Sequence, residues 1–419
     1  METNWKKNTA LFLTGQALSL FGSMLVQYAI LWYITLKTQS GITITVFTIF
    51  GFLPMFFISP FGGVWADRFN RKYIINISDG VIALASLVIA AFLIFGYESF
   101  GILLAGTVVR SFGQGVQMPA VGAFIPQIVP EAHLTKMNGI QGSIQSFITL
   151  TSPAASAALM SFTSLEILFF LDVLTAACGI SILFFFVKAP KPETPPEQKP
   201  VKYLRDLKEG FRYIKSHRHI LYLIVLSSVF MFFASPSAML TPLQVTRNFG
   251  NEVWRLSAIE IAFSAGMMAG GLAIGFWGGF KNRIFTIMLS CALFGIEAIA
   301  LGVTPVFWLY IAVMAGVGVT MPLYNTPLMV IMQTTVAPEF MGRVLSVVTM
   351  LGSVMMPLGI LVFGPLSDTV SINLILVATG LVMTLLSVLF AAIKPLRDAY
   401  PARQMGPVLP PNKPPRGKL

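Results

Sequence analysis

The sequence predicts an all-α integral membrane protein whose twelve transmembrane helices form two six-helix bundles. Its 419 residues are 55% hydrophobic and only 11% charged, with a mean hydropathy of +0.78, whereas soluble proteins have about 25% charged residues. Apolar runs long enough to cross a bilayer recur along the chain. A charged, proline-rich segment divides these runs into two equal sets.

The apolar runs supply the predicted helices, because about 20 consecutive apolar residues span the hydrocarbon core of a bilayer as a helix. Backbone N–H and C=O groups inside lipid must be satisfied within each segment, which also favours helices. The runs fall at 9–35, 42–65, 73–95, 100–125, 139–160, 165–187, 219–245, 254–279, 284–303, 306–332, 344–366 and 372–393.

Basic residues predict the orientation of the chain. Most of the 28 Lys and Arg residues lie in both tails and in alternate loops, and the opposite loops hold only Lys37, Arg247 and Arg255. Because basic loops stay in the cytoplasm, we expect a multi-pass protein of the cell inner membrane with both termini cytoplasmic. The net charge of +11 is then a topology signal and does not indicate nucleic-acid binding.

Several kinds of site are excluded by the residues that would build them. The two cysteines, Cys178 and Cys291, both fall within predicted helices, so we expect neither a disulfide framework nor a metal site. The patterns G-x-x-x-x-G-K-[ST], H-E-x-x-H and G-x-S-x-G do not occur. The sequence therefore predicts a protein that is not an enzyme, has no ATP-driven engine and needs no cofactor.

The chain divides into two halves and two polar segments. We expect an N-terminal six-helix bundle (1–187), a cytoplasmic linker (188–218), a C-terminal six-helix bundle (219–394) and a disordered basic cytoplasmic tail (395–419). Within the linker, apolar residues recur at helical spacing, which predicts a short amphipathic helix on the inner membrane surface. Those residues are Leu204, Leu207, Phe211 and Ile214.

An internal repeat supports the division into halves. The stretches "GQGVQMP" (113–119) and "GVGVTMP" (316–322) agree at five of seven positions, each in the fourth run of its half. Six-plus-six halves related by a repeat are typical of secondary transporters. The alternative is a chance recurrence of small residues and prolines, which are common in packed membrane helices.

One loop concentrates charge in an otherwise apolar chain. Residues 63–72 read G-x-x-x-D-R-x-N-R-K and resemble the loop between helices 2 and 3 of the major facilitator superfamily. Asn70 replaces the second glycine of that pattern, and we expect it in a left-handed conformation. We interpret the loop as a gating latch between the halves; the alternative is plain positive-inside charge. Its members are Gly63, Asp67, Arg68, Arg71 and Lys72.

Three further segments, 4–41, 51–72 and 108–130, are similar to the macrolide efflux proteins of that superfamily, a branch related to exporters of the enterobactin type. The resemblance runs through all the predicted helices and is densest in the first half. It implies the major facilitator fold and export driven by inward proton flow.

A few charged residues fall within the apolar runs, where a charge costs roughly 2.5–3.5 kcal/mol and therefore usually has a purpose. We interpret Arg110, Asp172, Glu260 and Glu297 as candidates for proton coupling. The alternatives are a fixed ion pair for Arg110 and ordinary hydrogen-bonded packing for the acids. Asp79 lies near the cytoplasmic end of its run and is assigned to the latch region.

Polar and aromatic residues predict the cavity walls, since the resemblance implies that helices 1, 4, 7 and 10 line the cavity. Aromatic and Met side chains suit large amphipathic ligands; the alternative is ordinary helix packing. The predicted substrate-binding residues are Gln16, Gln27, Tyr28, Arg110, Gln114, Met231, Phe232, Phe233, Tyr324 and Asn325, and Gln117 lies on the same helix as Gln114.

Three functional hypotheses follow. The first is a monomeric, proton-coupled exporter of amphipathic drugs, macrolides first, whose partners are a small-molecule substrate, protons and the lipid bilayer. The second is an exporter of an endogenous metabolite such as a siderophore, since Arg110 suits an anion. The third is a non-transporting membrane sensor built on the same fold.

Overall fold

The computed structural model describes residues 5–188, 203–337 and 340–391. Within these ranges the chain is helical and contains no strand. The first part of the predicted linker and the predicted tail lie outside the described residues.

Apart from the segment between η2 and α7, the helices follow one another with short connections. In chain order they are α1 (Trp5–Thr38), α2 (Gly41–Arg68), α3 (Arg71–Ile94), α4 (Phe100–Ile128), η1 (Glu131–His133), α5 (Leu134–Phe162), α6 (Leu165–Ser181), the π-helix η2 (Ile182–Phe186), α7 (Tyr203–Ser216), α8 (Arg218–Met239), α9 (Thr241–Phe249), α10 (Val253–Trp277), α11 (Arg283–Val303), α12 (Phe307–Thr335), α13 (Met341–Leu366) and α14 (Ile372–Ala391).

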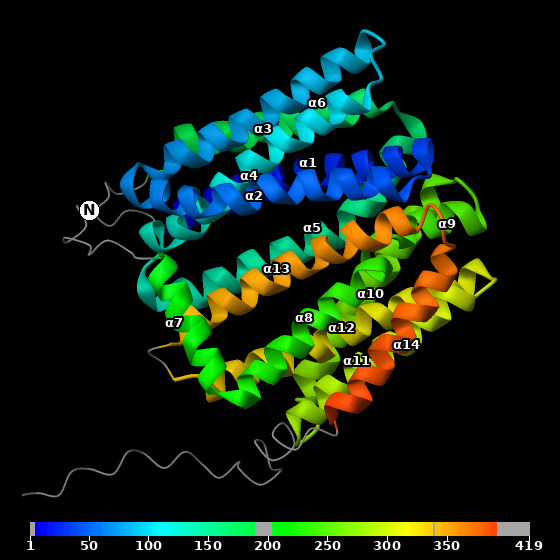
Figure 1. Cartoon of the computed structure of the whole chain (residues 1–419). Coiled ribbons are helices and arrows are strands. Elements are labelled where there is room, and N and C mark those ends of the chain that lie inside the picture. The colour runs from blue at the N-terminus through cyan, green and yellow to red at the C-terminus, as the bar shows by residue number, and fades with distance from the viewer. Residues whose placement is uncertain (1–4, 189–202, 338–339, 392–419) are drawn as a thin grey trace, which may run out of the picture.

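The long helices run up and down between two ends of the molecule (Figure 1). We call them the Asp67 end, which carries the turn between α2 and α3 at 69–70, and the Asp368 end, which carries the turn between α13 and α14 at 367–371. The helices α1 to α6 form one half and α8 to α14 the other. The halves contact each other through the pairs α2–α13, α5–α10 and α1–α9.

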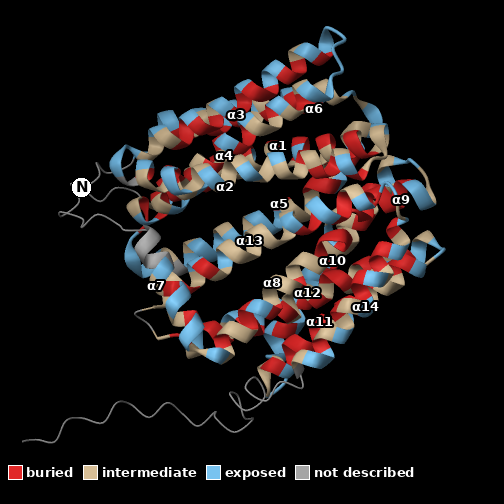
Figure 2. Cartoon of the chain, in the orientation of Figure 1, coloured by how far each residue is buried: buried red, intermediate tan, exposed pale blue. Residues whose placement is uncertain are grey.

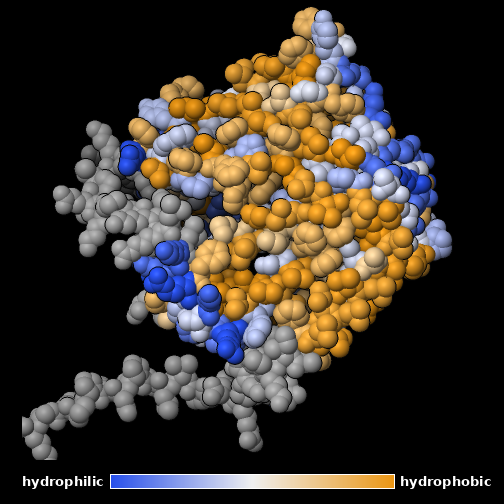
Figure 3. Space-filling view, viewed as in Figure 1, coloured by the Kyte–Doolittle hydropathy of each residue, from blue (hydrophilic) through white to orange (hydrophobic). Residues whose placement is uncertain are grey.

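The apolar surface identifies lipid as the solvent of most of the chain. Large apolar side chains are exposed along the helices, such as Phe57, Phe276 and Trp308 at 61%, 90% and 70%. Figure 3 shows the apolar colour over the broad flank and the polar colour mainly toward the ends, and Figure 2 shows buried residues concentrated where helices face one another.

Among the residues that the structure describes, ten spans are long and apolar enough to cross a membrane, with α8 and α9 counted as one. The helices α4 and α5 have the length but are less apolar, because they carry Arg110 and several glutamines. An integral membrane protein is thus confirmed, and the count of twelve spans stays a prediction.

The two halves share a core at the Asp368 end. The largest cluster of buried apolar residues belongs to the second half, and it extends into the first half through Trp32, Ile44 and Ala157. These residues lie toward the Asp368 ends of α1, α2 and α5. Hydrophobic packing therefore joins the halves at this end.

Two helix starts depend on asparagine side chains. Asn70 Oδ1 accepts from the backbone N–H of Lys72 at 3.0 Å, and Asn282 caps α11 in the same way. The expectation of a left-handed Asn70 was wrong, because its φ and ψ are −66° and 112°, the extended geometry of an N-cap residue.

The predicted short helix is α7, but it does not lie on the membrane surface alone. Tyr213 stacks on Phe340 with ring centroids 4.7 Å apart, and Glu209 pairs with Arg343 at 3.1 Å. Ile214 is buried in the core of the second half. The apolar face of α7 therefore covers α13 at the Asp67 end.

Close helix packing in the second half yields a stability prediction. A Cβ on Gly295 (α11) would come 2.7 Å from the Gly380 carbonyl oxygen of α14, whereas a Cβ on Gly271 would meet nothing within 4 Å. We expect Gly295→Ala to lower stability by about 1–3 kcal/mol through overpacking. Gly271→Ala, the matched control, should be neutral or stabilising. Thermal unfolding of the purified variants measures the difference; equal melting temperatures would contradict this packing.

Candidate functional site

A cavity of about 300 Å³ lies within the first half, between α1, α3, α4 and α5. Its lining positions fall in the middle of α1 and in the parts of α4 and α5 nearer the Asp67 end. The lining residues are Leu13, Gln16, Ala17, Ser19, Leu20, Ser23, Met24, Gln27, Ile82, Gln114, Gln117, Met118, Val121, Gly122, Gln141, Ile144 and Gln145.

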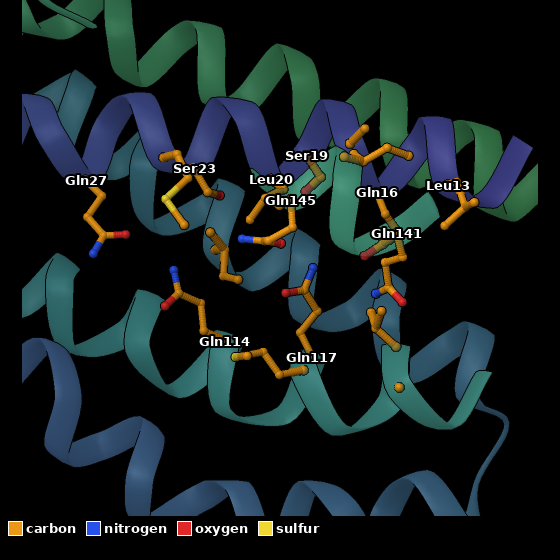
Figure 4. A pocket seen from close by; sticks show the side chains of 17 residues that line it. Leu13, Gln16, Ser19, Leu20, Ser23, Gln27, Gln114, Gln117, Gln141 and Gln145 are labelled. Carbon is orange, nitrogen blue, oxygen red and sulfur yellow. The ribbon is translucent and has the colours of Figure 1, made fainter. Parts of the chain in front are cut away.

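Amide side chains dominate the polar part of this pocket. Figure 4 shows glutamines from three helices reaching into the same space: Gln16 and Gln27 from α1, Gln114 and Gln117 from α4, Gln141 and Gln145 from α5. Each amide offers two donors and an acceptor oxygen. No lining residue carries a formal charge. The pocket therefore suits a neutral hydrogen-bonding group on a partly apolar ligand.

The structure brings together only part of the predicted cavity. Gln16, Gln27 and Gln114 line the pocket, but the prediction missed Gln141 and Gln145. These two glutamines are four residues apart and so share one helix face. The four-residue spacing of two glutamines was the signal in the sequence for a polar face on α5, which is less apolar than the other long helices except α4.

The other predicted cavity residues lie elsewhere. Tyr28 packs on Trp32 with ring centroids 5.5 Å apart, and Phe232 packs on Phe363 at 5.5 Å between α8 and α13. Tyr324 is fully buried and stacks on Phe230 at 4.4 Å, in the core of the second half rather than on this pocket.

Three more of the predicted residues are also absent from this lining. Met231 and Phe233 are half-buried beside Phe232, and Asn325 is exposed on α12.

Arg110 and Asp172 form an ion pair between α4 and α6. The oxygens of Asp172 also accept from Ser86 Oγ at 2.7 Å and from Ser23 Oγ at 3.1 Å. Arg110 and Asp172 are both almost completely buried. Because the guanidinium is already paired and does not line the pocket, this geometry favours a structural ion pair over a site for an anion.

The two glutamates of the second half occupy separate places. Glu260 on α10 is half-buried and lies close enough to Tyr28 of α1 for an electrostatic interaction across the halves. Glu297 on α11 accepts from Thr320 Oγ1 at 3.0 Å, and its other oxygen is buried without a partner among the described residues. Neither is joined to the Arg110–Asp172 pair.

Asp79 was assigned to the latch region, and its contacts place it elsewhere. The side chain is buried, and it accepts hydrogen bonds from Ser19 of α1 and Gln117 of α4. Both partners line the pocket. Asp79 therefore lies directly behind the pocket wall.

The described contacts of the predicted latch stay within the first half. Arg71 donates to the carbonyl oxygens of Ala66 at 2.9 Å and Ala123 at 3.0 Å, and Lys72 donates to those of Phe184 and Val187, each at 2.8 Å. Arg68 is exposed. The side chain of Asp67 is not among those that the structure describes.

No neighbouring helix packs closely against Gly63, the first residue of the predicted latch. A Cβ on Gly63 would meet nothing within 4 Å, whereas one on Gly62 would lie 2.8 Å from the Gly115 carbonyl oxygen of α4. In the equivalent turn of the second half, Gly278 and Gly279 have positive φ of 75° and 83°, so the two turns differ in backbone as well as in charge.

The Asp368 end holds a second charged cluster that the sequence interpretation missed. The Asp368 carboxylate accepts from the backbone N–H groups of Gly41 at 2.7 Å and Ile42 at 3.0 Å, and from Ser40 Oγ at 2.9 Å. Arg247 of α9 pairs with it at 3.0 Å and also donates to the Gln39 carbonyl oxygen. An anion at the N-terminus of α2 thus links the two halves.

These features define a multi-pass helical membrane protein of two packed halves. The family model of the Major Facilitator Superfamily matches residues 12–360, and the chain belongs to that family.

Relatives extend along nearly the whole chain. It is 30% identical to Macrolide efflux protein A of Streptococcus pyogenes over 94% of its own length and 98% of that protein. It is 24% identical to Multidrug efflux pump Tap of Mycolicibacterium fortuitum over 94% and 98% of the two lengths.

Solved structures share the fold. The nucleoside transporter NupG superposes with a TM-score of 0.72 at 14% identity, covering 92% of this chain and 100% of that one. A bacterial homologue of the iron transporter ferroportin, in an inward-facing state, gives a TM-score of 0.69 at 13% identity, with coverages of 93% and 100%. The family model and the relatives, rather than these shared folds, identify the protein as a membrane transporter and not an enzyme.

The Asp368 cluster yields a pH prediction. Burial alone would raise the pKa of Asp368, but the donors of Ile42, Gly41, Ser40 and Arg247 outweigh it and lower the pKa. A lowered pKa means that the carboxylate stabilises the contact at neutral pH. This stabilisation is lost as the pH falls below the ordinary value of 3.8 and through the lowered pKa.

We therefore expect Asp368→Asn to weaken the contact between the halves by about 1 kcal/mol, since the helix N-terminus and Arg247 lose an anion. Spin labels at exposed Phe162 and Thr369, with Cys178 replaced by Ser, report the separation at this end. Glu98→Gln is the matched control, because among the described residues the side-chain partners of Glu98 are Lys37 and Tyr33, both of its own half. An unchanged distance distribution in Asp368→Asn would show that the carboxylate does not hold the halves.

Proposed function

We propose that the protein is a secondary active exporter of amphipathic small molecules, macrolide-like drugs first, which works by alternating access and proton antiport in the bacterial cell inner membrane. The observation that carries the proposal is an amide-lined pocket in one half of a molecule whose halves are joined at the Asp368 end. Export is the activity named for Macrolide efflux protein A and for Tap, to which the whole chain is similar.

The arrangement of the halves supports alternating access. The helices α5 and α13 join the halves at the Asp368 end, but toward the Asp67 end their glycines are not packed against a neighbour. A Cβ atom added at any of these glycines would meet nothing within 4 Å: Gly139 and Gly142 of α5, Gly342 and Gly352 of α13. At the Asp368 end, by contrast, Gly41 and Gly364 leave no room for a Cβ. With the Asp67 end on the cytoplasmic side, as the basic loops predict, this is an inward-facing state.

The pocket chemistry favours the drug hypothesis over the siderophore hypothesis. An anionic ligand needs an available cation, but Arg110 is neutralised by Asp172 and does not line the pocket. The six glutamines, with Leu20, Met24, Met118 and Ile144 between them, offer hydrogen bonds and apolar contact to a large neutral or weakly basic molecule. We propose that the protein binds such a molecule as a monomer.

Proton coupling needs a buried group that gains and loses a proton. In the second half, Glu260 and Glu297 remain the proposed carriers, because neither is paired with a cation among the described residues. Asp172 is the weaker candidate, since a proton there would leave Arg110 buried and unpaired.

A vesicle experiment tests this function. Inverted vesicles that contain the protein should accumulate a radiolabelled macrolide when an inward-acidic proton gradient is imposed, and a protonophore should abolish the uptake. The double variant Gln16→Leu/Gln114→Leu should lower uptake by about tenfold, because two pocket hydrogen bonds are lost. Wild-type vesicles that move no member of a broad drug panel would reject the proposal and favour a non-transporting sensor.

The latch interpretation yields a kinetic prediction. We expect Asp67→Asn to slow turnover while leaving substrate affinity nearly unchanged, because Asp67 lies at the end of α2, away from the pocket lining. Glu131→Gln is the control, since Glu131 is an exposed acid at the same end. Transport rate and equilibrium binding are measured in parallel. A variant that turns over as fast as the wild type would remove Asp67 from the gating role.

A further inference from the structure

Asp79 is a buried acid with a half-satisfied carboxylate. The residue is 2% exposed on α3. Its Oδ1 accepts from Gln117 Nε2 at 2.6 Å and from Ser19 Oγ at 3.2 Å, while its Oδ2 is buried and has no hydrogen-bond partner among the described residues. An ionised oxygen without a donor in a dry interior is costly. A proton on this carboxyl group relieves that cost.

The two donors of Asp79 connect it to the pocket. Ser19 and Gln117 line the pocket and hold Asp79 at the same time, and Gln16 also interacts with the carboxylate. Figure 4 shows Gln16 and Ser19 on α1 and Gln117 on α4, facing one another across the pocket. A change in the charge of Asp79 is therefore transmitted to atoms that a ligand contacts.

We propose that Asp79 binds the proton that sets the hydrogen-bond polarity of the pocket, through the amide of Gln117. When Asp79 is ionised, Gln117 must direct its NH₂ group to the carboxylate, which leaves its oxygen free to accept from a ligand. When a proton from the aqueous cavity adds to the carboxylate, the carboxyl O–H donates to the Gln117 oxygen. The amide then turns its NH₂ group to the pocket.

The reversal of the Gln117 amide assigns a ligand class to the pocket. This assignment rests on the proposed export function. A hydroxyl or protonated amine on an amphipathic ligand pairs with the Gln117 oxygen only while Asp79 is ionised. Protonation replaces that acceptor with a donor and removes the negative charge behind the wall. Ligand and proton therefore compete at this pocket, which adds a proton site in the first half to the proposed carriers Glu260 and Glu297 of the second half.

The other charged groups near Asp79 are either paired with each other or far along their helices, so Asp79 is the group that we assign to the proton switch. Among the helices that pack around it, α4 contributes Arg110 and α6 contributes Asp172, and these two groups neutralise each other. Glu166 of α6 lies at the Asp368 end. The remaining charged residues of α1, α2 and α3 lie in the first or last turns of those helices: Lys6, Lys7, Lys37, Asp67, Arg68, Arg71 and Lys72.

Binding of radiolabelled erythromycin to the purified full-length protein tests the switch without transport. We expect wild-type affinity to fall by about tenfold or more from about pH 8 to about pH 5, the value of one hydrogen bond with a charged partner. Asp79→Asn should bind with little pH dependence. Gln117→Leu should also lose the pH dependence although Asp79 is intact, which keeps the test valid if Asp79→Asn does not fold.

Two matched controls isolate the connection. Gln114→Leu removes a pocket amide that does not contact Asp79, so binding should weaken at every pH while the pH dependence stays. Glu166→Gln changes an acid of the same half that also has a buried oxygen without a partner among the described residues, but Glu166 lies at the Asp368 end and does not line this pocket. It should keep the wild-type pH dependence of binding.

Infrared difference spectroscopy measures the proton itself and needs no ligand. The wild type should show a carboxylic-acid carbonyl band that titrates and is absent from Asp79→Asn but present in Gln117→Leu. Retained pH dependence of binding in Asp79→Asn, or no titrating band from Asp79, overturns the proposal. A titrating band in a protein that moves no drug in vesicles would instead reject only the export function.

Discussion

The contact between the Asp368 carboxylate and the first turn of α2 holds this arrangement of the two halves together. One charged side chain from the turn after α13 satisfies two backbone N–H groups that a helix N-terminus leaves without partners. Arg247 balances the charge from α9. Thr45 adds a hydrogen bond to the Ile360 carbonyl oxygen at 3.2 Å, and glycines allow α2 and α13 to touch. Because the halves are joined here, they are free to separate at the other end.

The same sequence pattern stands at both ends of the α2–α13 pair. Gly63 and Asp67 at the end of α2 have the spacing G-x-x-x-D, and so do Gly364 and Asp368 at the end of α13. The second pair is engaged across the halves, whereas Gly63 faces open space. We propose that the two pairs alternate during transport, since the end of α2 and the start of α13 both lie at the Asp67 end. Solvent-exposed ion pairs contribute little free energy each. They suit such a cycle, because the inward-facing and outward-facing states must remain within a few kcal/mol of each other.

The sequence could predict the helices and the family, because hydropathy and a charged turn are local properties. It could not pair Arg110 with Asp172, or Asp79 with Gln117, because these contacts depend on how helices rotate against one another. Asn70 was misjudged for a related reason: an asparagine can either take positive φ or cap a helix, and only the chain direction at α3 decides between them. Asp368 was missed although its spacing from Gly364 repeats that of Asp67 from Gly63.

One layer of uncharged side chains lies between the pocket and the charged residues of the first half. Glutamines line the pocket. Asp79 and the Arg110–Asp172 pair lie behind this lining and are hydrogen-bonded to Gln117, Ser19 and Ser23, which belong to it. A bare carboxylate in the wall would bind any cation strongly and release it slowly. A carboxylate that acts through an amide changes the binding free energy of the ligand by about the value of one hydrogen bond. That change is enough to favour loading or release without trapping the ligand. The low charge of the lining therefore suits the proposed export of amphipathic molecules, with the proposed proton site in the layer of side chains behind the pocket wall.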